Sequence, residues 1–343
     1  MNAEAATLDT LRRPLRNLRL SITDRCNLRC AYCMPEESYT WLPTPEILAF
    51  EEIAALVDHF LALGVRKVRL TGGEPLVRKD MSKLIAMLAK KPLDELALTT
   101  NGVLLEELCG ELKAAGLARV TVSLDTLSRA RFLKLTRRDL LAQVLAGIAA
   151  ARRVGLPLKL DTVLIRGVND HELIPLLDFA AEHDAELRFI EYMDVGGATH
   201  WAMDQVVSRK DVLAHLAARL GPVEPLPGRG SAPAERFRLP DGRVFGIVAS
   251  TTQPFCAACD RARLTADGQL FTCLYGTKGV DLKTPLRRRD SAGALEALIA
   301  EAWGARTDRG AEERLALREA RGPLATSAEL KTQPHLEMHT RGG

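Results

Sequence analysis

The sequence predicts an α/β protein whose central part is a partial barrel of six βα units, followed by a smaller α+β region. Strand-like and helix-like segments alternate six times between residues 18 and 220. Such an alternation requires parallel strands joined by right-handed crossovers. Six units are too few for a complete eight-stranded barrel, so an incomplete TIM-type barrel is the expected closure. A doubly wound open sheet is the alternative that the pattern leaves open.

The predicted elements follow one another in a regular order. Apolar residues spaced three and four apart predict the helices, and Gly64, Gly116 and Gly155 mark the ends of three of them. The predicted strands lie at residues 18–23, 67–71, 95–100, 119–124, 157–165 and 186–193. The predicted helices lie at residues 43–63, 81–90, 104–115, 140–154, 173–183 and 209–220.

Polar and apolar residues alternate along several predicted strands. On the first strand Arg19 and Ser21 share one face, opposite Leu18 and Leu20. Parallel strands normally bury apolar residues on both faces, so polar residues on one face indicate a wet interior that holds a ligand. Internal salt bridges among these side chains are the alternative. The polar face comprises Arg19, Ser21, Thr23, Arg69, Thr71, Thr121, Ser123, Asp125, Lys159 and Asp161.

Composition changes after the last βα unit. Residues 221–230 are rich in glycine and proline, which is typical of a linker. Beyond them, Asp241-Gly242 between two apolar segments predicts a β-hairpin at residues 235–249. We therefore expect a loosely ordered lead-in at 1–14, the barrel at 15–222, and a C-terminal domain at 223–343 that closes the barrel mouth.

Length, composition and net charge argue against several classes of protein. The 343 residues are 47% hydrophobic, yet no apolar run approaches the ~20 residues that span a membrane. The first residues lack the apolar core of a signal peptide, so a cytoplasmic location is expected. A net charge of +3 gives no argument for nucleic-acid binding. Seven cysteines in such a chain favour metal binding over disulfides, and Cys109, isolated in a helix, is expected to be a small buried hydrophobe.

Three cysteines, Cys26, Cys30 and Cys33, form a Cys-x-x-x-Cys-x-x-Cys array directly after the first predicted strand. Thiolates spaced this closely on one loop can converge on a metal centre but cannot all pair as disulfides. A tetrahedral zinc and a cubane cluster each ask for four ligands, whereas this loop supplies three. A cubane held by three thiolates leaves one iron open for a small molecule, which favours a cluster. A zinc knuckle, which usually shows paired Cys-x-x-Cys units, is the alternative.

A second set of three cysteines lies in the C-terminal region. Cys256 and Cys259 form a Cys-x-x-Cys pair, and Cys273 follows after thirteen residues. An incomplete zinc site and a second cluster with an open iron both fit, and the lack of a nearby histidine ligand favours the cluster. Arg261 and Arg263, two positions apart, project to one side of an extended segment, where they could clamp a phosphate or a carboxylate. A solvated basic edge is the alternative for each arginine.

The second predicted strand ends in Thr71-Gly-Gly-Glu-Pro75. Paired glycines at the carboxyl end of a barrel strand let the backbone approach a ligand closely, at the end where barrels place their sites. An ordinary βα turn is the alternative. Combined with the first cysteine array, in which Tyr32 precedes the last cysteine, the sequence resembles the radical S-adenosylmethionine (SAM) enzymes. The resemblance implies a partial barrel of the radical SAM kind.

Two further features narrow the resemblance to the GTP 3′,8-cyclase family. They are the Cys259-Asp-Arg-Ala-Arg-Leu-Thr motif with the later Cys273, and the terminal Gly342-Gly343. The similarity covers residues 18–343, nearly the whole chain. Arg341 departs from the pattern, because the family commonly has an apolar residue before the glycines, so the packing of the tail is expected to differ. The resemblance implies that the tail enters the active site, since glycines let a thin backbone pass where side chains would not. From the sequence alone, a terminal Gly-Gly could equally be a disordered end.

The resemblance implies two [4Fe–4S] clusters and SAM as cofactors. The implied cluster ligands are Cys26, Cys30, Cys33, Cys256, Cys259 and Cys273. The implied SAM contacts are Tyr32, Gly73, Ser123 and Met193. The implied GTP contacts are Arg19, Arg69, Thr100, Lys159, Arg261, Ala262 and Arg263. Strand alternation independently predicts that three of these cations, Arg19, Arg69 and Lys159, lie on the interior face of the barrel.

The implied reaction is the cyclisation of GTP to (8S)-3′,8-cyclo-7,8-dihydro-GTP, the first step of molybdenum cofactor biosynthesis. SAM, reduced by the first cluster, yields methionine and a 5′-deoxyadenosyl radical that takes the ribose 3′ hydrogen, while the second cluster binds guanine. The implied partners are GTP, a reductant for the clusters and, as a pathway link, cyclic pyranopterin monophosphate synthase. No nucleic-acid or membrane partner is expected, and both a monomer and a homodimer fit the sequence.

Two other functions compete with this interpretation. A peptide-modifying radical SAM enzyme with an auxiliary cluster usually carries more cysteines in its C-terminal region than the three found here. A zinc-dependent RNA-binding module predicts basic patches with interleaved aromatic residues, whereas the chain is only 5% aromatic. Metal analysis separates them, because the radical SAM enzymes contain iron and sulfide and the module contains zinc.

Overall fold

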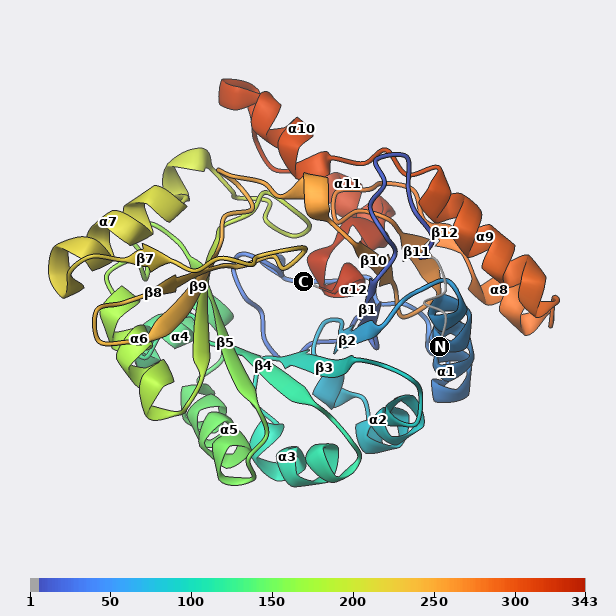
Figure 1. Ribbon diagram of the computed structural model, residues 1–343, viewed down its shortest axis with the longest axis horizontal. Coiled ribbons are helices and arrows are strands. Elements are labelled where there is room, and N and C mark those ends of the chain that lie inside the picture. Colours follow the sequence, from blue (N-terminus) through green and yellow to red (C-terminus); the bar gives the residue numbers. More distant parts are fainter. Residues whose placement is uncertain (1–5, 343) are drawn as a thin grey trace.

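Six parallel strands lie side by side in chain order in the computed structural model, which describes residues 6–342 (Figure 1). Every predicted strand of the βα series is confirmed, with ends shifted by two residues or fewer. The α/β class and the parallel sheet are therefore as predicted. The strands are β1 (Asn17–Ser21), β2 (Lys67–Thr71), β3 (Glu95–Thr100), β4 (Arg119–Ser123), β5 (Leu158–Leu164) and β6 (Glu186–Glu191).

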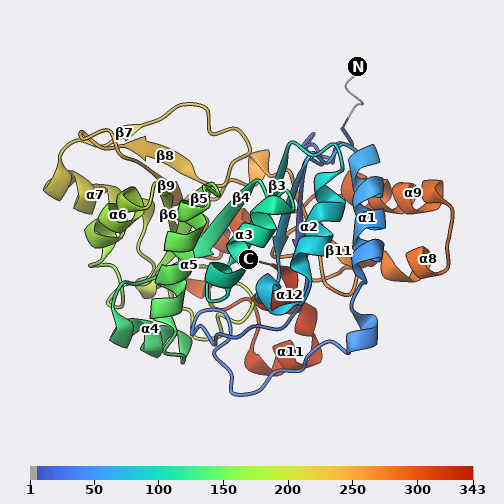
Figure 2. The same cartoon turned by 90° about the horizontal axis from the view of Figure 1, so that it is seen from below.

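Helices connect these strands and lie on the outer side of the sheet (Figures 1 and 2). The predicted helices are confirmed, except that the first begins seven residues later than position 43, after a 3₁₀ turn at Thr44–Glu46. Prolines at positions 43 and 45 explain the delay, because a proline disfavours helical backbone in the residue before it. The helices are α1 (Phe50–Ala62), α2 (Met81–Ala89), α3 (Leu105–Ala114), α5 (Leu141–Arg153), α6 (Leu173–Glu182) and α7 (Arg209–Leu220).

One helix was not predicted. Helix α4 (Arg129–Thr136) buries only Phe132, Leu135 and Thr136, so its sequence carries little helical apolar periodicity. Its start is stabilised by Ser128, whose hydroxyl accepts a hydrogen bond from the backbone N–H of Arg131. Its position matters for the site, because its last residues contact the first cysteine loop.

Strands from the C-terminal region extend the sheet at both edges. β9 (Val244–Val248) pairs in parallel with β6, and β10 (Arg261–Leu264) pairs in parallel with β1. The predicted hairpin is confirmed, since β8 (Glu235–Arg238) pairs antiparallel with β9. The C-terminal region thus continues the sheet, and the segment between β9 and β10, which carries Cys256 and Cys259, crosses from one end of the parallel row to the other. The outermost strands are β7 (Glu224–Pro225), β11 (Gln269–Phe271) and β12 (Val280–Asp281).

The two faces of the sheet differ as the alternation predicted. Leu18 and Leu20 of β1 and Val68 of β2 are 1% exposed or less and pack in the main core beneath the helices. Burial of such side chains contributes about 1.5–3 kcal/mol each to folding. Arg19 and Arg69 lie on the opposite, interior face. The sheet therefore holds a dry core on its outer side and polar groups on its inner side.

The N-terminal segment is ordered, contrary to the expectation of a loose lead-in, over the part that the structure describes. Leu8 and Pro14 form an antiparallel bridge around a turn, and Asp9 and Arg13 are buried. The segment lies against the C-terminal helix α9 (Ala292–Gly304), where the Trp303 indole N–H donates to the Arg13 carbonyl at 3.1 Å. Residues 1–5 of the predicted lead-in lie outside the described residues.

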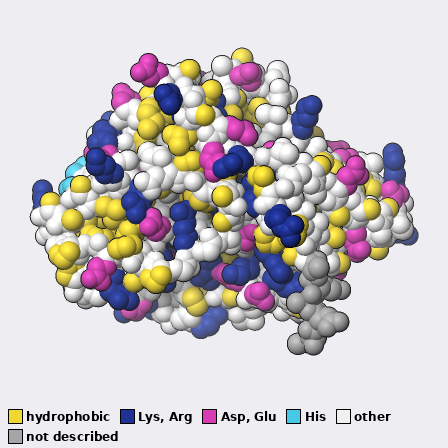
Figure 3. Space-filling model, turned by 45° about the horizontal axis from the view of Figure 1, so that its top comes forward, with side chains coloured by type: hydrophobic (Ala, Val, Ile, Leu, Met, Phe, Trp, Pro, Cys, Tyr) yellow, Lys and Arg dark blue, Asp and Glu magenta, His cyan; other side chains and the backbone are white. Residues whose placement is uncertain are grey.

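Four short helices complete the C-terminal region: α8 (Lys283–Arg287), α10 (Gly310–Ala316), α11 (Ser327–Thr332) and α12 (Met338–Arg341). On the face drawn in Figure 3, basic and acidic side chains are interspersed, in keeping with a net charge of only +3. Among residues 6–342, no helix is both long enough and apolar enough to cross a membrane. The predicted domain boundary near residue 222 stays a prediction.

Candidate active site

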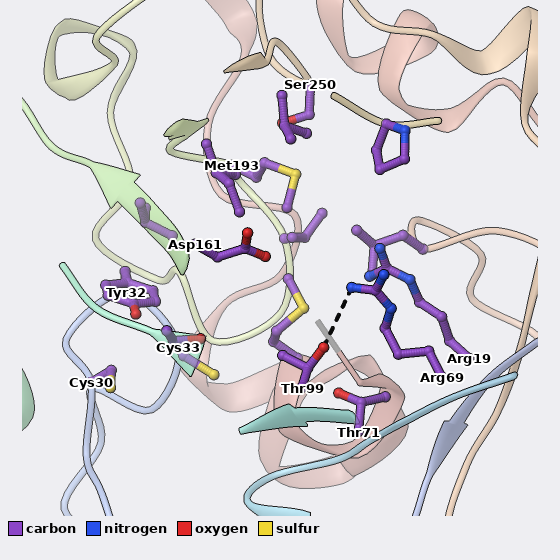
Figure 4. A pocket seen from close by; sticks show the side chains of 18 of the residues that line it. Arg19, Cys30, Tyr32, Cys33, Arg69, Thr71, Thr99, Asp161, Met193 and Ser250 are labelled. Carbon is purple, nitrogen blue, oxygen red and sulfur yellow. Dashed lines mark hydrogen bonds between the residues drawn. The ribbon is translucent and has the colours of Figure 1, made fainter. Parts of the chain in front are cut away.

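A cavity of about 320 Å³ opens on the polar face of the sheet (Figure 4). Strands β1 to β6 each contribute lining side chains, and the loops around the C-terminal cysteines cover the cavity from the other side. In Figure 4, Arg19 and Arg69 lie side by side on one wall, and Tyr32, Cys30 and Cys33 lie on the other. The cavity thus brings together residues predicted to bind metal, cofactor and substrate.

The first cysteine array forms a loop at the carboxyl end of β1, and Cys26, Cys30 and Cys33 line the cavity. The backbone N–H of Cys33 donates to the carbonyl of Cys30 at 3.0 Å, which folds the loop into a tight turn. The end of α4 supports the loop on both sides of Cys30, because the Thr136 and Leu135 carbonyls accept hydrogen bonds from the N–H groups of residues 29 and 31. The sequence signal for α4 is weak, so this support was not predicted.

The cysteines fit an iron–sulfur cluster better than a single zinc ion. All of them are free thiols. Among residues 6–342, no three His, Cys, Asp or Glu side chains converge closely enough to hold one metal ion. A zinc ion binds its sulfurs at about 2.3 Å and requires such convergence, whereas the thiolates of a cubane bind different irons around a wider space. Burial raises the pKa of Cys26 to about 11, so a thiolate there needs the positive charge of a metal.

The second cysteine set lies at the other end of the parallel strands. Cys259 and Cys273 line the cavity, whereas Cys256, the first residue of the 3₁₀ turn that ends before Cys259, does not. Strands β1 and β10 are parallel neighbours. Cys26 lies after the end of β1 and Cys259 lies before the start of β10, so the length of a strand separates the two sets. Five residues of strand span on the order of 17 Å. Burial raises the pKa of Cys259, but the nearby Arg261 and Arg306 outweigh burial and bring it down to about 7.

Arginine side chains occupy the space between the two cysteine sets. Burial, reinforced by the like charges of Arg263 and Arg261, lowers the pKa of Arg19 well below its usual value. Arg69 has one side-chain hydrogen bond, to the Thr99 hydroxyl at 3.5 Å. The competing explanation, internal salt bridges, holds for two residues of the polar face, since Lys159 pairs with Glu186 and Asp161 pairs with Arg188. Among residues 6–342, no salt bridge includes Arg19, Arg69, Arg261 or Arg263. Arg263 is buried and the other three are half-buried. Cations held in such a place without a counter-charge are costly, so the arrangement favours an anionic ligand.

Comparison with known proteins agrees with this geometry. Residues 20–180 match the Radical SAM superfamily and residues 185–312 match the family Molybdenum Cofactor Synthesis C. The chain is 53% identical to GTP 3′,8-cyclase 1 of Mycobacterium tuberculosis (strain H37Rv), over 98% of this chain and 95% of that protein. The chain belongs to the GTP 3′,8-cyclase family. GTP 3′,8-cyclases of Acidothermus cellulolyticus and Aquifex aeolicus are 46% and 44% identical over 96% and 92% of this chain, and 95% and 97% of their own lengths.

A solved structure supports the fold. The SAM-bound structure of SuiB from Streptococcus suis has a TM-score of 0.60 at 15% sequence identity, over 89% of this chain and 70% of that one. At such low identity the likeness extends to the fold only. As a radical SAM GTP 3′,8-cyclase, the chain is an enzyme that uses [4Fe–4S] clusters and SAM.

The cavity brings most of the predicted site residues of this cyclase together. Three predicted residues do not line it: Cys256, Lys159 and Ala262. Lys159 lies near the start of β5 and forms a salt bridge with Glu186 at 2.9 Å. Ala262 alternates with its two neighbouring arginines on β10 and is fully buried in the apolar core. The residues that do line it are Cys26, Cys30, Cys33, Cys259, Cys273, Tyr32, Gly73, Ser123, Met193, Arg19, Arg69, Thr100, Arg261 and Arg263.

Sequence reasoning missed Arg188 as a site residue of the cyclase. Arg188 lies on β6, lines the cavity, and donates two hydrogen bonds to the Asp161 carboxylate at 2.6 and 2.8 Å. The available signal was the alternation on β6, where Arg188 lies between the apolar residues Leu187 and Phe189. A second unpredicted contact fixes Tyr32, whose hydroxyl donates to Asp125 at 2.6 Å. Burial raises the pKa of Asp125 to about 6.

The Gly-Gly-Glu-Pro loop packs directly on the first cysteine loop. A Cβ on Gly73 would overlap the carbonyl oxygen of Arg25, so only glycine allows this approach. The buried Glu74 carboxylate accepts hydrogen bonds from the Thr100 hydroxyl at 2.7 Å and from the Asn101 N–H at 2.6 Å. Burial nevertheless raises the pKa of Glu74 to about 7. The motif therefore joins the ends of β1, β2 and β3 into one rigid wall.

The C-terminal tail reaches the cavity wall. Arg263 donates hydrogen bonds to the carbonyls of Arg341 and Gly342, and a Cβ on Gly342 would overlap the side chain of Thr71. The unusual Arg341 is buried, with its guanidinium 4.4 Å from the ring centroid of Phe271. A flat cation on an aromatic ring replaces the apolar contact expected there. Gly343 lies outside the described residues.

Replacing Gly197 by alanine is expected to displace the first cysteine loop. Gly197 follows β6, and an added Cβ would overlap the Cys33 carbonyl oxygen. Such overpacking typically costs about 1–3 kcal/mol, and here the strain falls on a predicted cluster ligand. We expect less iron in the first cluster and a lower unfolding temperature, measured by iron analysis and calorimetry. Gly293→Ala on α9 is the matched control, because its Cβ meets no atom within 4 Å, and normal iron in both variants would contradict the prediction.

Proposed function

We propose that the cavity binds GTP together with SAM, and that its side chains direct the cyclisation of GTP to 3′,8-cyclo-7,8-dihydro-GTP. The observation that carries this proposal is the set of half-buried or buried arginines between the two cysteine sets, which have no salt bridge among residues 6–342. A polyanionic substrate placed there would compensate their charge. It would also lie within reach of a cofactor bound at either end of the cavity.

The residues of the first loop would hold one cluster and orient SAM. Cys26, Cys30 and Cys33 would supply three thiolates, and a cubane held in this way would have one iron open for the amino and carboxylate groups of SAM. When bound, the cluster and SAM supply the reductive chemistry that generates a 5′-deoxyadenosyl radical. Tyr32, which donates a hydrogen bond to Asp125, would contact SAM from the cavity wall, as would Gly73, Ser123 and Met193.

The arginines would hold the triphosphate. Arg69 and Arg19 point into the cavity from neighbouring strands, and Arg263 approaches from β10 on the other side of β1. Guanidinium groups suit this task, because each presents a planar fork that can bind two phosphate oxygens. Lys159 would join them only by giving up its salt bridge with Glu186, and Ala262 would contribute only through its backbone. Thr100 would contact GTP from its place in the cavity wall.

Cys256, Cys259 and Cys273 would hold the second cluster, and their three thiolates again leave one iron open for guanine. Arg261 keeps cationic charge beside this set, with its guanidinium 5.1 Å from the Phe255 ring centroid and a hydrogen bond to the Ser231 carbonyl at 3.0 Å. The loops over the cavity would exclude water from a reactive intermediate. The chain would thus bind GTP and SAM, orient them toward each other, and keep water out of the cavity.

Other parts of the proposal concern the fold and the partners. The six βα units support a partial (β/α)6 barrel at residues 15–222, with residues 223–343 as the second unit. Cluster chemistry requires a reductant, and the product would pass to cyclic pyranopterin monophosphate synthase. Reduced cysteines are typical of the cytoplasm, which supports that location. The chain would act as a monomer or a homodimer.

The test is a turnover assay on the anaerobically reconstituted protein. With SAM, dithionite and GTP, we expect 5′-deoxyadenosine to form and the cyclised nucleotide to accumulate, with about eight irons per chain. ATP in place of GTP is the control. Formation of 5′-deoxyadenosine that is indifferent to GTP, or about four irons per chain, would contradict the proposal.

Arg69→Met separates a substrate-binding role from a structural one. Because Arg69 is a half-buried cation without a salt bridge among the described residues, its replacement should leave the stability of the substrate-free protein unchanged or higher. GTP affinity should fall about ten- to hundredfold, the range for a lost hydrogen bond to a charged group. Calorimetric GTP titration and thermal unfolding measure the two effects. Arg238→Met, on the exposed face of β8, is the control, and a destabilised Arg69→Met with normal GTP affinity would contradict the role.

A further inference from the structure

A buried group of three charged side chains lies beneath the second cysteine set, outside the cavity. Arg13 and Arg306 flank Asp9, and the three side chains are 2%, 1% and 0% exposed. Arg13 Nε is 2.5 Å from Asp9 Oδ2, and Arg306 Nη1 is 3.5 Å from the same oxygen. Two guanidinium groups therefore share one carboxylate. Arg13 and Asp9 come from the N-terminal turn, and Arg306 follows α9.

Both arginines donate hydrogen bonds to the backbone of cluster-ligand residues. Arg13 Nη1 donates to the Cys256 carbonyl at 2.9 Å, and Arg306 Nη1 donates to the Cys259 carbonyl at 2.8 Å. Arg13 Nη1 also donates to the Asp308 carbonyl at 2.8 Å. The Cys-x-x-Cys turn is thus held at both of its cysteines by side chains more than forty residues away in the sequence.

The group carries more positive charge than its interior neighbours neutralise. Arg13 Nη2 and Arg306 Nε are buried and have no hydrogen-bond partner among residues 6–342. The Asp308 carboxylate is 3.8 Å from Arg306 Nε, but its side chain is one-third exposed and accepts a hydrogen bond from Thr272. Such buried, partly unpaired cations are costly unless negative charge lies nearby. A cluster bound by three thiolates would bring that negative charge to the adjacent loop.

We propose that Arg13 and Arg306 are positioning residues for the second iron–sulfur cluster, which fix its Cys-x-x-Cys turn and stabilise its more negative, reduced state. The inference rests on the proposed function, because it takes Cys256, Cys259 and Cys273 to be cluster ligands. Hydrogen bonds and net charge around a cluster set its reduction potential, and groups that support metal ligands commonly alter metal affinity 10–100-fold.

A purely structural role is the competing explanation, since the same group ties the N-terminal turn to α9. Arg16, in the same segment, makes a hydrogen bond of the purely structural kind. Its guanidinium donates to the Gly64 carbonyl at 3.2 Å, away from the cysteines. Arg16→Met is therefore a matched control. It removes an arginine from the same segment without touching the second cysteine set.

The experiment measures the second cluster by itself. A full-length parent protein with Cys26→Ala, Cys30→Ala and Cys33→Ala lacks the ligands of the first cluster, so its iron and its paramagnetic resonance signal come from the second. The parent is reconstituted anaerobically and its midpoint potential is titrated with dithionite. Arg306→Met should shift the potential to a more negative value, because a cation near the cluster is lost. Asp9→Asn should shift it to a more positive value, because an anion is lost, and Arg16→Met should leave it unchanged.

Iron retention supplies a second readout. Arg306→Lys keeps the charge but loses the planar fork that reaches the Cys259 carbonyl, so it should retain most of the potential and lose iron to a chelator about tenfold faster. If Arg306→Met does not fold, the expected positive shift in Asp9→Asn supplies the potential readout. Equal potentials in Arg306→Met, Asp9→Asn and Arg16→Met, with only the unfolding temperatures changed, would overturn the proposal. A parent that binds no iron and sulfide would overturn both this inference and the assignment of the second cluster.

Discussion

Cys30→Ala is expected to abolish SAM cleavage while leaving the second cluster in place. Cys30 is the middle cysteine of the first array and a predicted cluster ligand, and the loop around it is held by the end of α4. Two remaining thiolates cannot hold a cubane that must also keep one iron open for SAM. After anaerobic reconstitution we expect about four irons per chain instead of about eight, and no 5′-deoxyadenosine. Chromatographic detection of 5′-deoxyadenosine with SAM and dithionite measures the loss.

Cys109→Ala is the matched control for this experiment. Cys109 is a buried thiol on α3, where its S–H donates to the Glu106 carbonyl at 3.7 Å, and it does not line the cavity. Its replacement should preserve full iron content and SAM cleavage. Cleavage retained in Cys30→Ala at the rate of the Cys109→Ala control would refute the assignment of the first cluster.

Asp194→Asn is expected to destabilise the protein by about 3–5 kcal/mol, the range for a buried ion pair that loses one partner. Asp194 follows β6 and is fully buried, and its carboxylate accepts hydrogen bonds from Arg321 at 2.9 Å and from Arg314 at 2.7 Å. The Tyr275 hydroxyl donates to it at 3.0 Å. Without the carboxylate charge, two guanidinium groups remain without compensation. Urea unfolding of the metal-free chain measures the change.

The effect of Asp194 should depend on pH. Burial raises the pKa of Asp194, but the two arginines outweigh it, and the net pKa lies below the ordinary value of about 3.8. A lowered folded-state pKa means that the carboxylate stabilises the fold fully above the unfolded pKa. This contribution is lost as the pH falls through the folded pKa. The difference between wild type and Asp194→Asn should therefore be constant above about pH 5 and shrink below about pH 4.

Asp139→Asn serves as the control for the pH series. Its pKa is also lowered, by the hydrogen bond from Arg129, but the pair lies on the surface. Solvent screens such pairs, so no measurable change in stability is expected at any pH. A difference between wild type and Asp194→Asn that persisted undiminished at pH 2 would contradict the role given to the Asp194 carboxylate.

Short-range patterns predicted much of the fold and the ligands of the candidate site. The alternation of Arg19 with Leu18 and Leu20 identified the two faces of β1, because side chains of a strand alternate strictly between faces. The cysteine arrays and the Gly-Gly-Glu-Pro loop were also recognisable, since their chemistry requires particular residues at fixed spacing. Each of these signals lies within a short stretch of the chain, so it can be recognised in the sequence alone.

Contacts between distant segments were not predictable. Nothing in the local sequence shows that β9 and β10, close in the chain, pair with opposite ends of the parallel row. The same holds for Lys159, whose polar character suggested a ligand contact but whose partner is Glu186 on the neighbouring strand. Helix α4 was missed because it contacts the cysteine loop through backbone carbonyls. Every residue type has a backbone carbonyl, so this contact cannot be recognised from the sequence.

The sequence by itself determined the order of βα units, the two thiolate sets and the cationic character of the interior, because each depends on residue type and spacing. Only the tertiary structure decided how these parts are combined. It placed the cysteine sets at opposite ends of β1, brought unpaired arginines between them, and packed the N-terminal turn beneath the second set. These arrangements depend on burial and charge summed over segments far apart in the chain, which no local pattern encodes.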